Sequence, residues 1–198
     1  MSFKILMVDV DGVVVHRPDG RRWDADLQAD LGIDPDALQS RFFAPHWWDI
    51  SHGRADLIER LAPVLEEIAP RVTAEALMAY WFAKDAHQNQ PLLDDLAALR
   101  AAGTPMWLAT VQDHRRAAYL WDTLGFRDRF EGVLHSALIG HSKPDGAYFN
   151  AVAERLAALP GDLLLIDDSA RNIEAAIAAG WQARRWSGEK TLAEVLAD

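Results

Sequence analysis

Five short apolar runs along the chain have the pattern of buried strands. They are FKILMV at residues 3–8, TPMWLAT at 104–110, GVLHS at 132–136, DLLLID at 162–167 and WQARRW at 181–186. In the segments before and between the last four runs, apolar residues recur at helical spacing. Gly103 and Gly125 stand where left-handed caps would end two of these helices. The alternation of helix and strand from about residue 90 predicts an α/β fold with a doubly wound (Rossmann-like) parallel sheet.

The interval between the first two predicted strands is about 90 residues long, far more than one crossover helix requires. Its pattern is almost wholly helical: Asp34 with Pro35 suits a helix start, and Thr73 suits another. A further helical face contains Pro63, which is expected to kink or divide that helix. We therefore expect an inserted helical subdomain at residues 16–89. Residues 1–15 and 90–198 would form the α/β core.

Composition narrows the class of protein. Half of the 198 residues are hydrophobic and a quarter are charged, as in an ordinary globular protein large enough for one domain with an insertion. No apolar stretch approaches the roughly 20 residues of a membrane span, and the first residues lack a secretory signal, so a cytoplasmic location is expected. The absence of cysteine excludes disulfides and thiolate sites. A net charge of −10 disfavours nucleic acid and anionic membranes as partners.

Polar residues stand at the ends of several predicted strands or just before a helix. They are Asp9, Asp11, Thr110, Lys143, Asp167 and Asp168. Ligands of an open parallel sheet collect at the carboxyl ends of its strands, so these six side chains are expected to converge. Several carboxylates in one cleft need a cation, and hard oxygen ligands without His or Cys favour Mg²⁺. Mg²⁺ keeps positions open for a substrate phosphate, which points to phosphoryl chemistry with Asp9 attacking phosphorus and Asp11 protonating the leaving oxygen.

Four segments, in order, resemble the motifs of the haloacid dehalogenase-like (HAD) hydrolase superfamily. They are DVDGVV, LATVQ, SKPDGAYF and LLIDDSARNIEAAIAAGW. The insertion is similar in place and length to the helical cap of the subgroup with phosphoglycolate phosphatases, sugar phosphatases and phosphomutases. The segment HWWDISHGRADL is similar to a cap segment of glucose-1-phosphate phosphatase-like members. The resemblance implies a Mg²⁺-dependent phosphatase that hydrolyses a small phosphorylated metabolite through an aspartyl-phosphate.

The resemblance also implies roles in phosphoryl transfer. Asp9 would be the nucleophile, and Asp11 the general acid and base. Thr110 and the amide of Val111 would hold the transferring phosphoryl oxygens. Lys143 would neutralise the phosphoryl group and orient the nucleophile.

A metal site is implied by the same motifs. Asp9, Asp168 and the backbone carbonyl of Asp11 would hold the Mg²⁺. Asp167 would contact these ligands and not the ion itself, and Asn172 would brace the loop.

Residues in the insertion are candidates for substrate recognition. Trp47 and Arg54 are expected to contact the leaving group, with His46, Trp48 and His52 as further candidates, although the tryptophans suit the insertion's own core equally well. The remaining histidines receive no role. These are His16, His87, His114, His135 and His141. The two arginines of RRAAYLW, on so acidic a chain, are interpreted as a solvated helix face.

Alternative functions remain open on the same core. A sugar phosphomutase has the same motifs, and a haloacid dehalogenase also uses an aspartate nucleophile but lacks the second acid that Asp11 provides. A catalytically silent binding module is the alternative of a different class. We expect closure of the insertion over the core about hinges at residues 15–22 and 85–91, and a monomer or homodimer.

Overall fold

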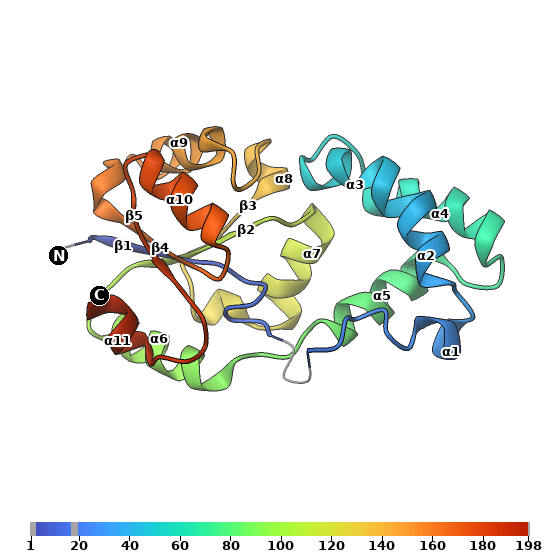
Figure 1. Ribbon diagram of the computed structural model, residues 1–198, viewed down its shortest axis with the longest axis horizontal. Coiled ribbons are helices and arrows are strands. Elements are labelled where there is room, and N and C mark those ends of the chain that lie inside the picture. The colour runs from blue at the N-terminus through green and yellow to red at the C-terminus, as the bar shows by residue number, and fades with distance from the viewer. Residues whose placement is uncertain (1–2, 17–19, 198) are drawn as a thin grey trace.

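A parallel sheet forms the centre of the computed structural model, which describes residues 3–16 and 20–197. Its strands are β1 (Ile5–Val8), β2 (Met106–Thr110), β3 (Val133–His135), β4 (Leu163–Asp167) and β5 (Gln182–Arg185). They lie in the order β3-β2-β1-β4-β5, and every neighbouring pair is parallel (Figure 1). All five predicted strands are confirmed, each one or two residues shorter than its apolar run.

Helices cover both faces of this sheet. They are α6 (Gln90–Ala101), α7 (His114–Ala118), η2 (Tyr119–Thr123), η3 (Phe126–Asp128), α8 (Ser136–Ile139), α9 (Gly146–Arg155), η4 (Pro160–Asp162), α10 (Ala170–Ala178) and α11 (Leu192–Ala197). Alternate residues of β1 point to opposite faces. Leu6 and Val8 join one apolar cluster with α6 and α11, whereas Met7 joins another with α9 and α10. Figure 1 shows these helix pairs on opposite sides of the strands, which confirms the doubly wound arrangement.

A separate group of helices lies between β1 and β2 in the chain. It consists of α1 (Leu27–Leu31), α2 (Pro35–Leu38), η1 (Gln39–Phe43), α3 (Ala44–Ser51), α4 (Leu57–Ile68) and α5 (Ala74–Lys84). We call this group the helical segment. It stands to one side of the sheet in Figure 1 and has its own apolar cluster, which includes Leu38, Leu61 and Leu77.

The helix starts predicted in this segment are observed. Asp34 accepts a hydrogen bond from the backbone amide of Asp36 at the start of α2, and the Thr73 hydroxyl accepts one from the amide of Ala76 at the start of α5. Pro63, however, does not divide its helix, because α4 runs through it. Pro63 lies on the exposed side of α4, while Leu61 and Leu65 on the other side are buried, so packing holds the helix together.

The helical segment leaves and rejoins the core at neighbouring points. Val15 pairs with Gln88 in an antiparallel bridge, and the amide of His16 donates to the carbonyl of His87 at 2.9 Å. The first of these points follows the carboxyl end of β1 and the second is paired with it, so the helical segment is attached beside that edge of the sheet. Residues 17–19 of the expected first hinge lie outside the described residues. In the described part of the chain, every helix is too short or too polar to cross a membrane.

Candidate active site

The carboxyl ends of β1 and β4 bring two predicted residues together. Val8 pairs with both Leu108 and Ile166, so the next residues along the three strands, Asp9, Ala109 and Asp167, are level with one another. Asp9 comes directly after β1, and Asp167 is the last residue of β4. Both are buried, as expected for side chains at the centre of the sheet edge.

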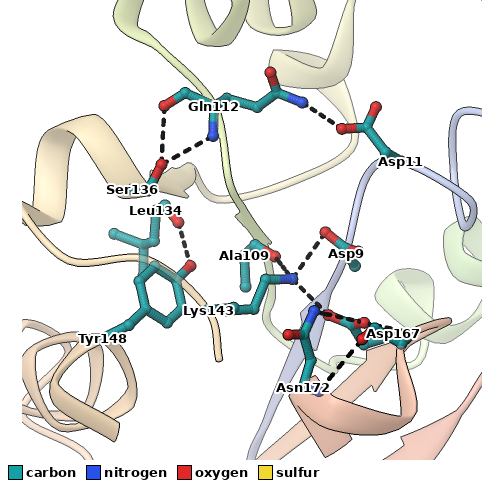
Figure 2. Close-up of polar contacts among 11 residues, drawn as sticks. Asp9, Asp11, Ala109, Gln112, Leu134, Ser136, Lys143, Tyr148, Asp167 and Asn172 are labelled. Atoms are coloured by element: carbon teal, nitrogen blue, oxygen red, sulfur yellow. Dashed lines mark hydrogen bonds and ion pairs between the residues drawn. The ribbon is translucent and has the colours of Figure 1, made fainter. Parts of the chain in front are cut away.

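Lys143 enters this edge from the loop before α9. Its Nζ lies 2.9 Å from Oδ1 of Asp9 and 2.5 Å from Oδ2 of Asp167, and it donates to the carbonyl of Ala109 at 2.8 Å (Figure 2). Three acceptors thus match the three N–H groups of an ammonium. The lysine side chain is 1% exposed, so its charge acts in a dehydrated setting.

Asp167 is held from several directions. Besides Lys143, it accepts hydrogen bonds from Nδ2 of Asn172 at 3.0 Å (Figure 2). It also accepts one from the backbone amide of Ser169 at 2.9 Å. The expected bracing of this loop by Asn172 therefore has a definite geometry, in which the amide orients Asp167. Ser169 also caps α10, so the loop and the helix start form one unit.

Three carboxylates are arranged as a possible metal site. Asp9, Asp167 and Asp168 each offer one oxygen, and these atoms lie within 4.8 Å of one another. Asp167 thus belongs to this group together with Asp9 and Asp168, the two aspartates expected to bind the ion. Asp11 does not supply a side-chain oxygen to this group, which is compatible with the backbone contact expected of it.

The electrostatics of these groups fit a divalent cation. Burial raises the pKa of Asp9 to about 7 against the lowering effect of Lys143, and the neighbouring charge of Asp167 adds to the rise. Partial burial and the charge of Asp167 also raise the pKa of Asp168. Burial by itself would lower the pKa of Lys143, but the charges of Asp9 and Asp167 leave it raised. Three acids with one lysine hold excess negative charge on hard oxygen atoms, the donor set that Mg²⁺ prefers.

A glycine allows the metal-site carboxylates to approach the loop after β1. Gly12 has a left-handed φ of +81°, and a Cβ built on it would lie 2.3 Å from Oδ2 of Asp168. Any larger residue would collide with this carboxylate. The DVDG sequence therefore needs its glycine for space as well as for backbone conformation.

Asp11 is oriented by a residue that sequence analysis did not select. Nε2 of Gln112 donates to Oδ2 of Asp11 at 2.5 Å, and the Gln112 backbone is held by Ser136, whose hydroxyl accepts from its amide at 3.0 Å (Figure 2). Gln112 is buried. Its position two residues after Thr110, within LATVQ, was the available signal.

Thr110 is the last residue of β2, and its side-chain hydroxyl is buried. The residue is 1% exposed, and its Oγ1 has no hydrogen-bond partner among the described residues. A buried hydroxyl without a partner is costly, and a bound anion would satisfy it. Val111 follows it at the mouth of the site and lines a cavity of about 320 Å³ together with Asp11 and Gln112.

The interpretation of RRAAYLW as a solvated face is wrong for one arginine. Arg116 is 1% exposed, donates to the carbonyls of Phe82 and Asp85, and packs on the rings of Phe82 and Tyr119. The helical segment covers this side of α7, a contact that net charge could not indicate. Arg115 remains partly exposed and pairs with Asp56 of the helical segment at 2.8 Å.

The candidates from the insertion separate into two groups. Trp47 lines the cavity that contains Asp11. Arg54 lies over the ring of Trp48 and lines a different cavity, of about 310 Å³, beside His114. His52 also stacks on Trp48, and His46 does not line the cavity of Trp47.

Comparison with known proteins gives a consistent result. The family model described as haloacid dehalogenase-like hydrolase matches residues 3–180. A phosphoglycolate phosphatase of Pseudomonas putida is 26% identical over 188 residues, covering 90% of this chain and 67% of its own length. Another, of Thiobacillus denitrificans, is 26% identical over 189 residues, covering 91% of this chain and 81% of its own.

A solved structure has the same fold. The magnesium complex of a HAD family enzyme from Bacteroides thetaiotaomicron superposes with a TM-score of 0.82 at 20% identity, and the match covers 100% of both chains. The same enzyme in complex with magnesium and inorganic phosphate gives a TM-score of 0.79 at 19% identity over 98% of both chains.

Proposed function

The chain belongs to the haloacid dehalogenase-like hydrolase family, and on that premise we propose that it is a Mg²⁺-dependent phosphatase of small phosphorylated metabolites. The observation that carries the proposal is the position of Asp9. Its carboxylate contacts Lys143 and lies with two further carboxylates. Asp9 is level with Ala109 of β2, and the hydroxyl of the next residue, Thr110, has no hydrogen-bond partner in the described part of the chain. The name of the relatives, phosphoglycolate phosphatase, supports the same reaction type.

Mg²⁺ would be held by Asp9, Asp168 and the backbone carbonyl of Asp11, with Asp167 within reach. When bound, it would neutralise phosphoryl oxygens and restrain their orientation. The carboxylates of the chain therefore both bind the ion and keep the nucleophile beside the phosphate.

The first chemical step belongs to Asp9. One oxygen of its carboxylate attacks phosphorus, and the bond between phosphorus and the ester oxygen breaks as the aspartyl-phosphate forms. Lys143 restrains Asp9 and balances charge on the phosphoryl group. The hydroxyl of Thr110 and the amide of Val111 donate to the phosphoryl oxygens.

Asp11 would act as the general acid and then as the general base. Its carboxyl group donates a proton to the leaving oxygen, so the product departs as an alcohol. The resulting carboxylate then takes a proton from the water that attacks the aspartyl-phosphate, which releases phosphate and restores Asp9. The bond from Gln112 supports this role because it fixes the direction of the Asp11 side chain.

The helical segment would act as a cap. In this proposal residues 16–89 close over a core of residues 1–15 and 90–198, excluding water and selecting the leaving group. The ion pair of Arg115 with Asp56 and the bonds from Arg116 to the end of α5 support a closed arrangement. Hinges would lie at residues 15–22 and 85–91.

Release of inorganic phosphate tests the proposal. The purified protein is assayed on p-nitrophenyl phosphate and a panel of metabolite monophosphates with Mg²⁺ and with chelator. We expect Mg²⁺-dependent release that Asp9→Asn lowers by on the order of 10³-fold or more, while Asp95→Asn, a change on the exposed side of α6, has no effect. No Mg²⁺-dependent release by the wild type, or full activity of Asp9→Asn, would overturn it.

A further inference from the structure

A cavity of about 320 Å³ lies where the leaving group of the proposed reaction would be. One side is formed by Asp11, Val111 and Gln112 at the carboxyl edge of the sheet. In the proposed mechanism Asp11 protonates the leaving oxygen. Asp11 also lines a cavity of about 290 Å³, which it shares with Gly12 and Asp168 on the side of the metal site. Of these two cavities, Val111, whose amide would hold the phosphoryl group, lines only the one of about 320 Å³. We therefore place the group attached to the leaving oxygen in the cavity of about 320 Å³.

The opposite side is made of four aromatic rings from the helical segment. We call Trp23, Phe43, Trp47 and Trp81 the aromatic wall, because all four line the cavity. Trp23 stacks on Trp81 with ring centres 5.2 Å apart and planes inclined by 25°. Phe43 and Trp47 contact Trp81 at 5.3 and 5.7 Å.

These mutual contacts make the wall a rigid apolar surface. Trp81 is buried at its centre, while the other three rings are only partly buried and keep accessible surface. Rings that already hold one another lose little conformational freedom when a ligand packs on them. The aromatic wall is therefore preorganised to pack against a flat group of a ligand.

The charges around the cavity disfavour a second anion. The ionisable side chains that line it are Asp11, Asp85 and Arg116. Arg116 is held by the carbonyls of Phe82 and Asp85 and lies between two rings, so its position serves the junction of α5 with α7. Asp11 is protonated when the substrate binds in the proposed mechanism, so a carboxylate on the leaving group would meet the charge of Asp85 and an arginine that already donates to two carbonyls.

We propose, building on the phosphatase function above, that the substrate is a phosphomonoester whose alcohol carries an uncharged ring that packs on the aromatic wall. A nucleoside base and the C–H face of a sugar share this chemistry. The two-carbon carboxylic acid of phosphoglycolate does not: it would leave the wall uncovered and place its charge in the cavity that Asp85 lines. The preferred substrate would thus differ from phosphoglycolate, the substrate in the name of the relatives.

The test compares three classes of ester on the wild type with Mg²⁺. They are ring esters (2-naphthyl phosphate, a nucleoside monophosphate and a hexose phosphate), an uncharged ring-free ester (glycerol phosphate) and phosphoglycolate. We expect kcat/KM for at least one ring ester to exceed that for glycerol phosphate and phosphoglycolate by about tenfold or more. The best ring ester identifies the source of the ring.

Variants of the aromatic wall test whether it causes the preference for ring esters. Trp47→Leu and Trp23→Leu are each expected to lower kcat/KM for the ring ester about tenfold more than for glycerol phosphate, chiefly through KM. Trp48→Leu is the matched control, because Trp48 lies on the same helix as Trp47 but is 55% exposed and does not line the cavity. Thermal melting verifies folding of each variant. As a readout independent of turnover, tryptophan fluorescence of Asp9→Asn is expected to change on adding the ring ester more than on adding glycerol phosphate.

The outcomes separate the two proposals. Hydrolysis of phosphoglycolate or glycerol phosphate as efficiently as every ring ester overturns the ring inference and leaves the phosphatase intact. Equal losses for both ester classes in Trp47→Leu and Trp23→Leu also overturn it. If no ester is hydrolysed by the wild type, the phosphatase proposal fails and the ring inference falls with it.

Discussion

Replacing Gly12 by alanine tests how the turn after β1 controls the metal site. Gly140→Ala is the matched control, because the two glycines have nearly equal left-handed φ values of +81° and +79°. Each substitution costs about 1–2 kcal/mol of backbone strain. An added Cβ at Gly140 meets nothing within 4 Å, whereas at Gly12 it would lie 2.3 Å from Oδ2 and 2.7 Å from Cγ of Asp168. The difference between the variants therefore isolates the collision with the carboxylate.

The size of the effect follows from this collision. The Asp168 oxygen must retreat by about 1 Å to reach an ordinary contact of 3.4 Å. This is about half of the 2.0–2.1 Å separating Mg²⁺ from a ligand oxygen. We expect Gly12→Ala to weaken Mg²⁺ binding by roughly 10- to 100-fold, the range found when the support of a metal ligand is removed. Gly140→Ala is expected to bind Mg²⁺ as the wild type does.

Isothermal titration with Mg²⁺ measures the affinity directly, and the Mg²⁺ concentration for half-maximal phosphate release gives a second value. Both variants are expected to melt a few degrees lower than the wild type, because they share the backbone strain. Equal Mg²⁺ affinities for Gly12→Ala and Gly140→Ala, with both proteins folded, would refute the reasoning.

Two further predictions concern the junction of the helical segment with the core and a buried histidine. Gly53→Ala would place a Cβ 2.2 Å from the backbone oxygen of Ala137, whereas the Cβ of Gly32→Ala, at a similar φ, meets no described atom within 4 Å. In steady-state assays we expect Gly53→Ala to lower kcat/KM by about tenfold or more and Gly32→Ala to leave it unchanged. Burial, with the charge of His114, lowers the pKa of His135 to about 4. The unfolded chain therefore binds this proton more readily than the folded one. The free energy of unfolding is expected to fall by up to about 3 kcal/mol as the pH drops from about 6.5 towards 4. Urea unfolding at pH 7, 5.5 and 4 is expected to show a smaller loss for His135→Phe, and parallel curves for the two proteins would contradict this.

The sequence by itself determined the sheet and the residues at its edge. Short continuous apolar runs such as DLLLID are typical of strands in a sheet covered on both faces, and the helical periods between them favour parallel crossovers. Once β1, β2 and β4 are parallel neighbours, Asp9, Thr110 and Asp167 must lie at one edge. Local pattern and chain direction were therefore sufficient to predict where the chemistry lies.

Only the tertiary structure decided which side chains meet. Gln112 orients Asp11 across 101 positions of the chain, and Arg116 is buried by carbonyls more than 30 residues away. The aromatic wall is likewise assembled from η1, α3, α5 and the turn before α1. Trp47 lines the cavity, whereas its neighbour Trp48 is exposed to solvent. Periodicity reports the burial that a residue's own helix or strand imposes. Partners distant in the chain depend on how those elements pack, and packing depends on the shapes of all the side chains at once.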